Sequence, residues 1–207
     1  MTLLFDDCEI KQEKRKAQPS RLWYEKYRWF FTSAGALVIG GKSAEQNEEV
    51  IKKHTKEYEI VMHTKQAGSP FSVIKTKEPS ARDLQETAIF TACFSRAWRE
   101  GKKKTEIHIF RGEQICKEKQ DKPGTFHVLG EVQKVNAELK LGLLFQQGKL
   151  RAVPLGVGKP FLIIKPGKLE KERTIELIKE KLKEKGIDVS KEEIGRAIPS
   201  GGFSISQ

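Results

Sequence analysis

The segment from residue 28 to residue 48 constrains the fold more than any other part of the chain. Its aromatic run at 29–31 and its aliphatic run at 37–39 consist of residue types that are favoured in strands. Gly35, between the two runs, suits a tight turn because glycine adopts a positive φ without a steric clash of a Cβ. The pattern therefore predicts a β-hairpin.

A helix is expected immediately after this hairpin. Gly40 and Gly41 let the chain leave the second strand, and Ser43 is a candidate N-cap for a helix over 43–54. Gln46 stands three residues after Ser43, which predicts a capping box. A bare backbone at a helix start is suited to binding an anion or a nucleic acid, although the glycine spacing is not that of a P-loop.

The charge balance favours a polyanionic partner. The 207 residues include 39 basic and 28 acidic ones, for a net charge of +11. The length allows one large domain, or a domain with an appendage. A chain rich in Lys and Glu is also typical of heat-adapted proteins, so the charge alone does not identify nucleic acid as the partner.

The distribution of Cys, His and Asp argues against a disulfide framework and a metal site. Cys8, Cys93 and Cys116 are widely spaced, and no C-x-x-C, H-x-x-x-H or D-x-D pattern occurs. We expect no metal and no cofactor. The apolar start of the chain is too short for a signal peptide, and no later run is long enough to cross a membrane. The expectation is a soluble, cytoplasmic protein with no membrane partner.

Periodicity predicts an α+β fold in which a mostly antiparallel sheet packs against a long central helix. That helix is expected from Ser80, its N-cap, to Gly101, which ends it. Turn formers at 154–159 suggest a boundary, followed by a small C-terminal α/β extension. The predicted units are a polar arm at 1–20, a main domain at 21–153 and the C-terminal unit at 154–207.

Aromatic residues interleaved with basic ones between residues 21 and 31 suit contacts with single-stranded RNA or an RNA loop. Alternation along a strand places Trp29 and Phe31 in the core. Tyr24 and Tyr27 are the residues expected to be exposed.

His63 lies at the expected end of a strand, before a loop that contains Lys65, Gly68 and Ser69. In this position the imidazole can contact phosphate, donate to a base or act as an acid or base. It can equally be structural, with its ring nitrogens bonded to nearby backbone, which is the usual case for a lone His. No catalytic residue is therefore assigned.

A series of short motifs runs in a fixed order from about residue 21 to residue 135. It comprises 23–33, 37–42, 44–48, His63-Thr64-Lys65, Gly68-Ser69, the strand 72–74, the helix end at 95–98 and Lys122-Pro123-Gly124. In this ordered set the chain resembles the NFACT-R domain. The resemblance implies an α+β fold and an RNA partner, either tRNA or ribosomal RNA.

NFACT-R is the RNA-binding domain of ribosome-associated quality-control factors, which hold tRNA on a large ribosomal subunit with a stalled nascent chain. The long factors also carry an N-terminal domain, a helix-hairpin-helix and a coiled coil, for which 207 residues leave no room. The resemblance therefore does not carry over their tailing activity. It implies a stand-alone short form with a C-terminal extension.

Three functions stay open at this point. The first is a non-enzymatic RNA-binding protein in translation or ribosome-associated quality control, with the large ribosomal subunit as a candidate partner. The second is an RNA-processing or RNA-modification enzyme, or its accessory subunit, with His63 as acid or base. The third is an adaptor that docks on the ribosome through residues 154–207. The expected nucleic-acid surface consists of Tyr27, Arg28, Gly40, Gly41, Lys42, Gln46, Asn47, His63, Lys65, Gly68, Ser69, Lys102, Lys103 and Lys104.

Overall fold

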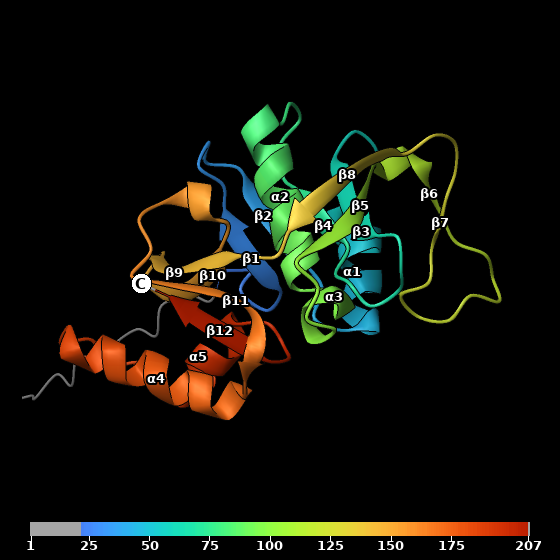
Figure 1. Cartoon of the computed structure of the whole chain (residues 1–207). Helices are drawn as coiled ribbons and strands as arrows, with labels where there is room; N and C mark the ends of the chain where they lie inside the picture. Colours follow the sequence, from blue (N-terminus) through green and yellow to red (C-terminus); the bar gives the residue numbers. More distant parts are fainter. Residues whose placement is uncertain (1–21, 207) are drawn as a thin grey trace, which may run out of the picture.

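The computed structural model describes residues 22–206, so the predicted polar arm at 1–20 and Cys8 lie outside the described residues. Within this range the chain has an α+β fold with antiparallel sheets, as predicted (Figure 1). The helices are α1 (Ala44–His54), α2 (Ala81–Cys93), α3 (Arg96–Arg99), α4 (Lys171–Glu184) and α5 (Lys191–Ala197).

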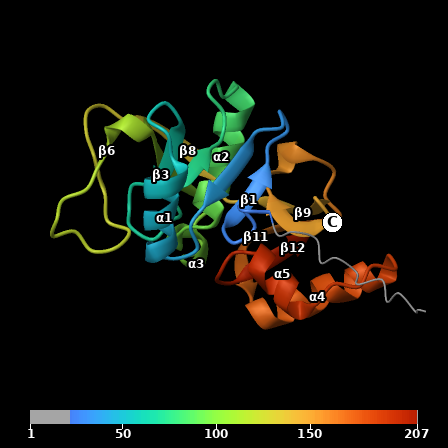
Figure 2. The ribbon, with the colours of Figure 1, turned by 180° about the vertical axis from the view of Figure 1, so that it is seen from behind.

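The larger sheet has six antiparallel strands in the order β1-β2-β4-β3-β5-β8. The predicted hairpin is confirmed, since β1 pairs with β2 and places Arg28 opposite Gly40. A separate two-stranded ribbon, β6 (Ile115–Cys116) with β7 (His127–Val128), carries the long loop at one end of the molecule (Figure 2). The six strands are β1 (Arg28–Phe31), β2 (Leu37–Gly40), β3 (Ile60–Thr64), β4 (Ser72–Ile74), β5 (Lys104–Arg111) and β8 (Gln133–Glu138).

Both faces of the sheet are largely covered at β1, β2, β3 and β4, which explains the apolar runs of these strands. Successive side chains of a strand point to opposite faces. Phe30 and Val38 accordingly join the hydrophobic cluster that includes residues of α2, whereas Trp29 and Ile39 join a second cluster with Val50 of α1. The sheet is therefore held between α1 on one side and α2 on the other.

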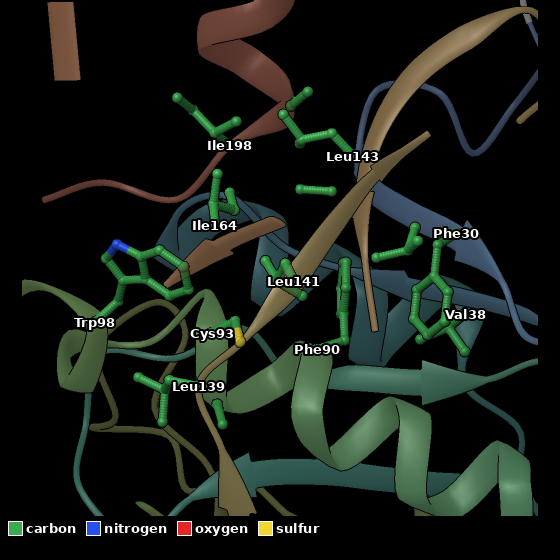
Figure 3. Close-up of a cluster of buried hydrophobic side chains, with 14 of the residues drawn as sticks. Phe30, Val38, Phe90, Cys93, Trp98, Leu139, Leu141, Leu143, Ile164 and Ile198 are labelled. Atoms are coloured by element: carbon green, nitrogen blue, oxygen red, sulfur yellow. The ribbon is translucent and has the colours of Figure 1, made fainter. Parts of the chain in front are cut away.

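A four-stranded sheet follows, in the order β10-β9-β11-β12. It lies between α2 above and α4 and α5 below in both views (Figures 1 and 2). Leu141 and Ile164 of this sheet pack in one cluster with Phe90 and Cys93 of α2 (Figure 3). Its strands are β9 (Leu141–Gln146), β10 (Lys149–Val153), β11 (Leu162–Leu169) and β12 (Phe203–Ser206).

The predicted division at residue 154 stays a prediction. The four-stranded sheet pairs strands from both sides of that position, with Leu162 opposite Leu143 and Val153 opposite Gly142. The side chain of Gln146 also joins the two sheets, because it accepts from the Phe31 amide at 2.9 Å and donates to the Phe31 carbonyl at 2.7 Å. These bonds satisfy backbone groups at the outer edge of β1.

The helical region at 80–101 differs from the single long helix that the apolar stripe predicts. The helix starts as expected, with Ser80 as N-cap in a capping box closed by Asp83. It ends at Cys93, because the Ser95 hydroxyl donates to the Ala92 carbonyl and accepts from the Ala97 amide, which starts the short helix α3. Periodicity does not reveal this break, since the apolar positions continue through it.

Candidate functional site

A pocket of about 730 Å³ opens where the start of α1, the β3–β4 loop, the α2–α3 turn and the loop at 123–128 meet. Eight of the predicted surface residues line it, namely Arg28, Gly41, Lys42, Asn47, His63, Lys65, Gly68 and Ser69. Six do not, namely Tyr27, Gly40, Gln46, Lys102, Lys103 and Lys104. The fold therefore gathers into one cavity residues that are up to 41 positions apart, from Arg28 to Ser69.

The start of α1 is fixed by side chains that the sequence suggested as RNA contacts. Ser43 caps the helix as predicted, accepting from the Gln46 amide at 3.2 Å. The Gln46 side chain accepts from the Lys42 amide at 3.0 Å and donates to the Lys26 carbonyl at 3.3 Å, so it does not complete the expected box with Ser43. The Lys42 ammonium also donates to the Lys26 carbonyl, at 2.8 Å. These bonds tie the glycine corner to the segment before β1.

Asn47 joins α1 to the β3–β4 loop. Its side-chain amide donates to the Ser69 carbonyl at 3.3 Å, and its carbonyl oxygen accepts from the Phe71 amide at 3.1 Å. Gly41 is required beside it, because a Cβ there would lie 2.3 Å from Asn47 Oδ1 and 2.6 Å from the Asn47 amide nitrogen. Asn47 therefore positions the pocket wall from within the protein.

His63 lies at the end of β3, with its ring stacked on Phe71 at 4.3 Å between centroids. Its Nδ1 is 2.6 Å from the Thr64 carbonyl, and because a carbonyl oxygen can only accept, this nitrogen carries a proton. Burial lowers the pKa of His63 to about 4, so the ring is neutral at pH 7. Nε2 is then an acceptor, which suits an N–H or O–H donor better than a phosphate. The cross-strand neighbour of His63 is His108.

The long loop is held against α1 by Glu48. The Glu48 carboxylate accepts from the Lys117 ammonium at 2.7 Å and from the Gly124 amide at 2.9 Å. Hydrogen bonds from Lys117, Lys52 and the Gly124 amide lower the pKa of Glu48 to about 2, so it is charged at neutral pH. Pro123 and Gly124 consequently form a fixed wall of the pocket.

The charge around the pocket is of one sign. Its lining includes the cations Arg28, Lys42, Lys65 and Arg99, and no Asp or Glu is among the described residues that line it. Phe94 and Phe126 supply half-buried apolar surface beside these cations, whereas Phe71 and Phe110 are buried, with 5% and 4% of their surface exposed. A phosphate-bearing ligand matches the charge of this lining.

Two expectations about exposure are wrong. Tyr24 and Tyr27 are buried, with 8% and 0% of their surface exposed, because both pack in the cluster between the sheet and α1. The aromatic residue exposed in this region is Trp23, at 48%, and it stacks on His54. Trp29 is buried as predicted, whereas Phe31 is half-buried.

Several lining residues were missed by the sequence reasoning. Phe94 lies at the break between α2 and α3, which the periodicity hides, and Arg99 is the last residue of α3. Ser200 comes from the C-terminal unit, where Trp98 Nε1 donates to the Gly202 carbonyl at 3.0 Å and holds the chain beside α3.

Metal ligation and membrane insertion find no support in residues 22–206. No group of three or more His, Cys, Asp or Glu is placed to hold an ion there. No helix in the described part of the chain is long and apolar enough to cross a membrane.

Comparison with known proteins gives the pocket a context. The family described as the NFACT protein RNA binding domain matches residues 26–130, which include all but one of the residues that line the pocket. An archaeal Rqc2 homolog, aRqcH of Methanocaldococcus jannaschii, is 37% identical over 209 residues, covering 94% of this chain and 31% of that protein. The human ribosome quality control complex subunit NEMF is 38% identical over 79 residues, covering 37% of this chain and 7% of that protein.

A solved structure supports the fold. The C-terminal part of the fibronectin/fibrinogen-binding protein from Streptococcus suis aligns with a TM-score of 0.51 and 22% identity, over 63% of this chain and 51% of that one. At this identity the likeness concerns the fold alone. The family match, by contrast, covers half of the sequence, and the chain therefore belongs to the family of the NFACT protein RNA binding domain.

Proposed function

We propose that the protein binds RNA in the pocket at the start of α1. One observation carries the proposal, namely that four cations line the cavity together with aromatic side chains and without an Asp or Glu among its described lining residues. Lys and Arg neutralise phosphates, and aromatic faces stack on unpaired bases. A net charge of +11 adds a long-range attraction for any polyanion.

The RNA is tRNA or ribosomal RNA, and the setting is ribosome-associated quality control. The setting is inferred from the relatives, which include a ribosome quality control complex subunit, and tRNA and ribosomal RNA are proposed because a ribosome presents both. The chain covers 31% and 7% of two such relatives, so the proposal concerns RNA binding alone and not the whole activity of those proteins.

The proposed role is binding without catalysis. A pKa of about 4 leaves His63 far from the neutral range in which a general acid or base works best. Its geometry instead suits recognition, since Nδ1 is used by the Thr64 carbonyl and Nε2 is left to accept from a base or a ribose hydroxyl. An RNA cleavage or modification activity that His63→Ala abolishes would contradict this role.

The test is a titration of tRNA and of a ribosomal RNA fragment across a salt series. If about three or four phosphates are neutralised, the logarithm of the affinity should fall with the logarithm of salt with a slope of roughly −2 to −4. Arg99→Ala should weaken binding, whereas Arg196→Ala, an equally exposed arginine outside the pocket, should not. Absence of binding at low salt, or binding that salt does not change, would rule the proposal out.

A further inference from the structure

Arg28 is a half-buried cation at one side of the pocket, and its charge has no counterion there. Its guanidinium carbon lies 4.4 Å from the centre of the Phe94 ring. No carboxylate of residues 22–206 forms an ion pair with it. Burial lowers the pKa of Arg28 to about 10, so the side chain is still charged at neutral pH.

A second cation, Lys171, lies within electrostatic range of Arg28. Lys171, the first residue of α4, has its pKa lowered first by burial and second by repulsion from Arg28. Removing a cation from water without a partner is unfavourable, and a like charge nearby adds to the cost. An anion bound to Arg28 in the pocket would compensate its burial and weaken the repulsion that Lys171 experiences.

Arg151 is a second arginine packed on an aromatic ring, and carboxylates act on its charge even though its Nε is buried without a hydrogen-bond partner among the described residues. Its guanidinium carbon lies 4.1 Å from the centre of the Trp29 ring, and the residue is half-buried like Arg28. The carboxylates of Glu193 and Glu25 act on Arg151 and partly offset its burial. Arg151 also lies outside the lining of the pocket. The two arginines therefore have similar aromatic packing, but carboxylates offset the burial of Arg151 alone.

We propose that Arg28 binds a single phosphodiester group of the RNA, with Arg99 and Ser200 completing this phosphate subsite. The inference rests on the proposed function and deepens it. Both additional residues line the same pocket. Gly201 lets the chain pass close to Arg99, because a Cβ at residue 201 would lie 3.0 Å from the Arg99 Cα. Ser200 lies outside the family match at 26–130, so the C-terminal unit contributes a donor to the site.

The experiment compares Arg28→Met with Arg151→Met, since both remove one positive charge from above an aromatic ring. The probe is a short single-stranded RNA in which one phosphodiester at a time is replaced by an uncharged methylphosphonate. In the wild type, one linkage should be sensitive, with binding weakened roughly tenfold when it is neutralised. Arg28→Met should bind the unmodified RNA more weakly than the wild type by a similar factor. Replacing the same linkage by methylphosphonate should then cause no further loss of affinity in this variant.

Two further readouts separate a ligand contact from a structural role. Arg28→Met should lower the salt slope by about 0.7, the value for one phosphate of a single strand, and should raise the melting temperature of the RNA-free protein. Arg151→Met should leave the slope unchanged. Arg28→Lys keeps the charge and loses the bidentate fork, so it should keep the slope and lose part of the affinity.

The outcomes are distinguishable. Suppose that the wild type binds RNA and that both Met variants match the wild type in affinity and in salt slope. The phosphate subsite is then refuted, and the proposed function survives. If inorganic phosphate displaces the RNA from the wild type as effectively as unlabelled RNA does, the site takes free phosphate, and the phosphodiester assignment is overturned. If the wild type binds no RNA, both proposals fail together.

Discussion

Gly124 is the residue whose replacement should open the pocket without unfolding the protein. It has a φ of +76°, and a Cβ at this position would lie 2.8 Å from both the Cα and the carbonyl oxygen of Ala44, at the start of α1. Both of these atoms belong to backbone, so a side-chain rotation cannot relieve the contact. Gly124→Ala should therefore push the loop at 117–126 away from α1.

The size of the effect follows from the contacts that are lost. An alanine at positive φ costs about 1 kcal/mol. Moving the loop also breaks the hydrogen bond from the Gly124 amide to the Glu48 carboxylate, now 2.9 Å, and a bond to a charged group contributes about 1.5–3 kcal/mol. Together these terms disfavour the closed loop by about 3 kcal/mol, which is roughly a hundredfold in its opening equilibrium.

Gly130→Ala is the matched control. Gly130 has the same φ of +76°, but a Cβ there would meet only Gln114 Nε2, at 3.7 Å. The control thus measures backbone strain alone. In Gly124→Ala, amide hydrogen exchange over 117–126 should be accelerated roughly a hundredfold. In the control, exchange near residue 130 should be accelerated about fivefold or less. RNA affinity should fall only in Gly124→Ala. Equal exchange and equal affinity in the two variants would refute the idea that close packing on Ala44 holds this wall.

Three further predictions concern the supports of the site. Asn47→Ala loses two side-chain hydrogen bonds, so urea denaturation should show a loss of about 1–3 kcal/mol; a change below about 0.5 kcal/mol would contradict the bridging role. The folded state disfavours protonated His63, because the pKa of this residue is about 4 when folded and 6.5 when unfolded. The free energy of unfolding should therefore fall as pH drops from 6.5 toward 4, and His63→Gln should flatten that decline. Equal pH profiles for the two proteins would contradict the burial of a neutral His63. Ser80→Ala should cost about 1 kcal/mol in thermal unfolding and more than Ser43→Ala, because only Ser80 has a closed capping box; equal losses would show that the box adds nothing.

The fold was predictable where the pattern was local. Runs of β-formers on either side of Gly35 gave the first hairpin, and Ser43 and Ser80 gave the starts of α1 and α2. The pattern failed at Ser95, whose hydroxyl ends one helix and caps the next while the apolar spacing continues. Such a break depends on a competition between side-chain and backbone hydrogen bonds that composition does not reveal.

The site was predictable in its location more than in the roles of its residues. The sequence suggested Asn47 and Gln46 as RNA contacts because they stand beside the glycine corner at a helix start, but the fold uses both amides to bind its own backbone. Tyr27 was expected to be exposed, because a local pattern does not reveal which distant segment packs on a side chain. In the structure it packs in one cluster with Val50 of α1. Ser200 had no signal, since only the tertiary contact with Trp98 brings it to the pocket.

The most direct test of RNA binding in this pocket is a hydrogen-exchange footprint of the protein with and without saturating tRNA at low salt. We predict that the RNA slows exchange at the start of α1, in the β3–β4 loop, at the α2–α3 turn and in the loop at 117–126, while the solvent-facing side of α4 is unchanged. Protection confined to α4 and α5, or no protection despite binding, would contradict the account.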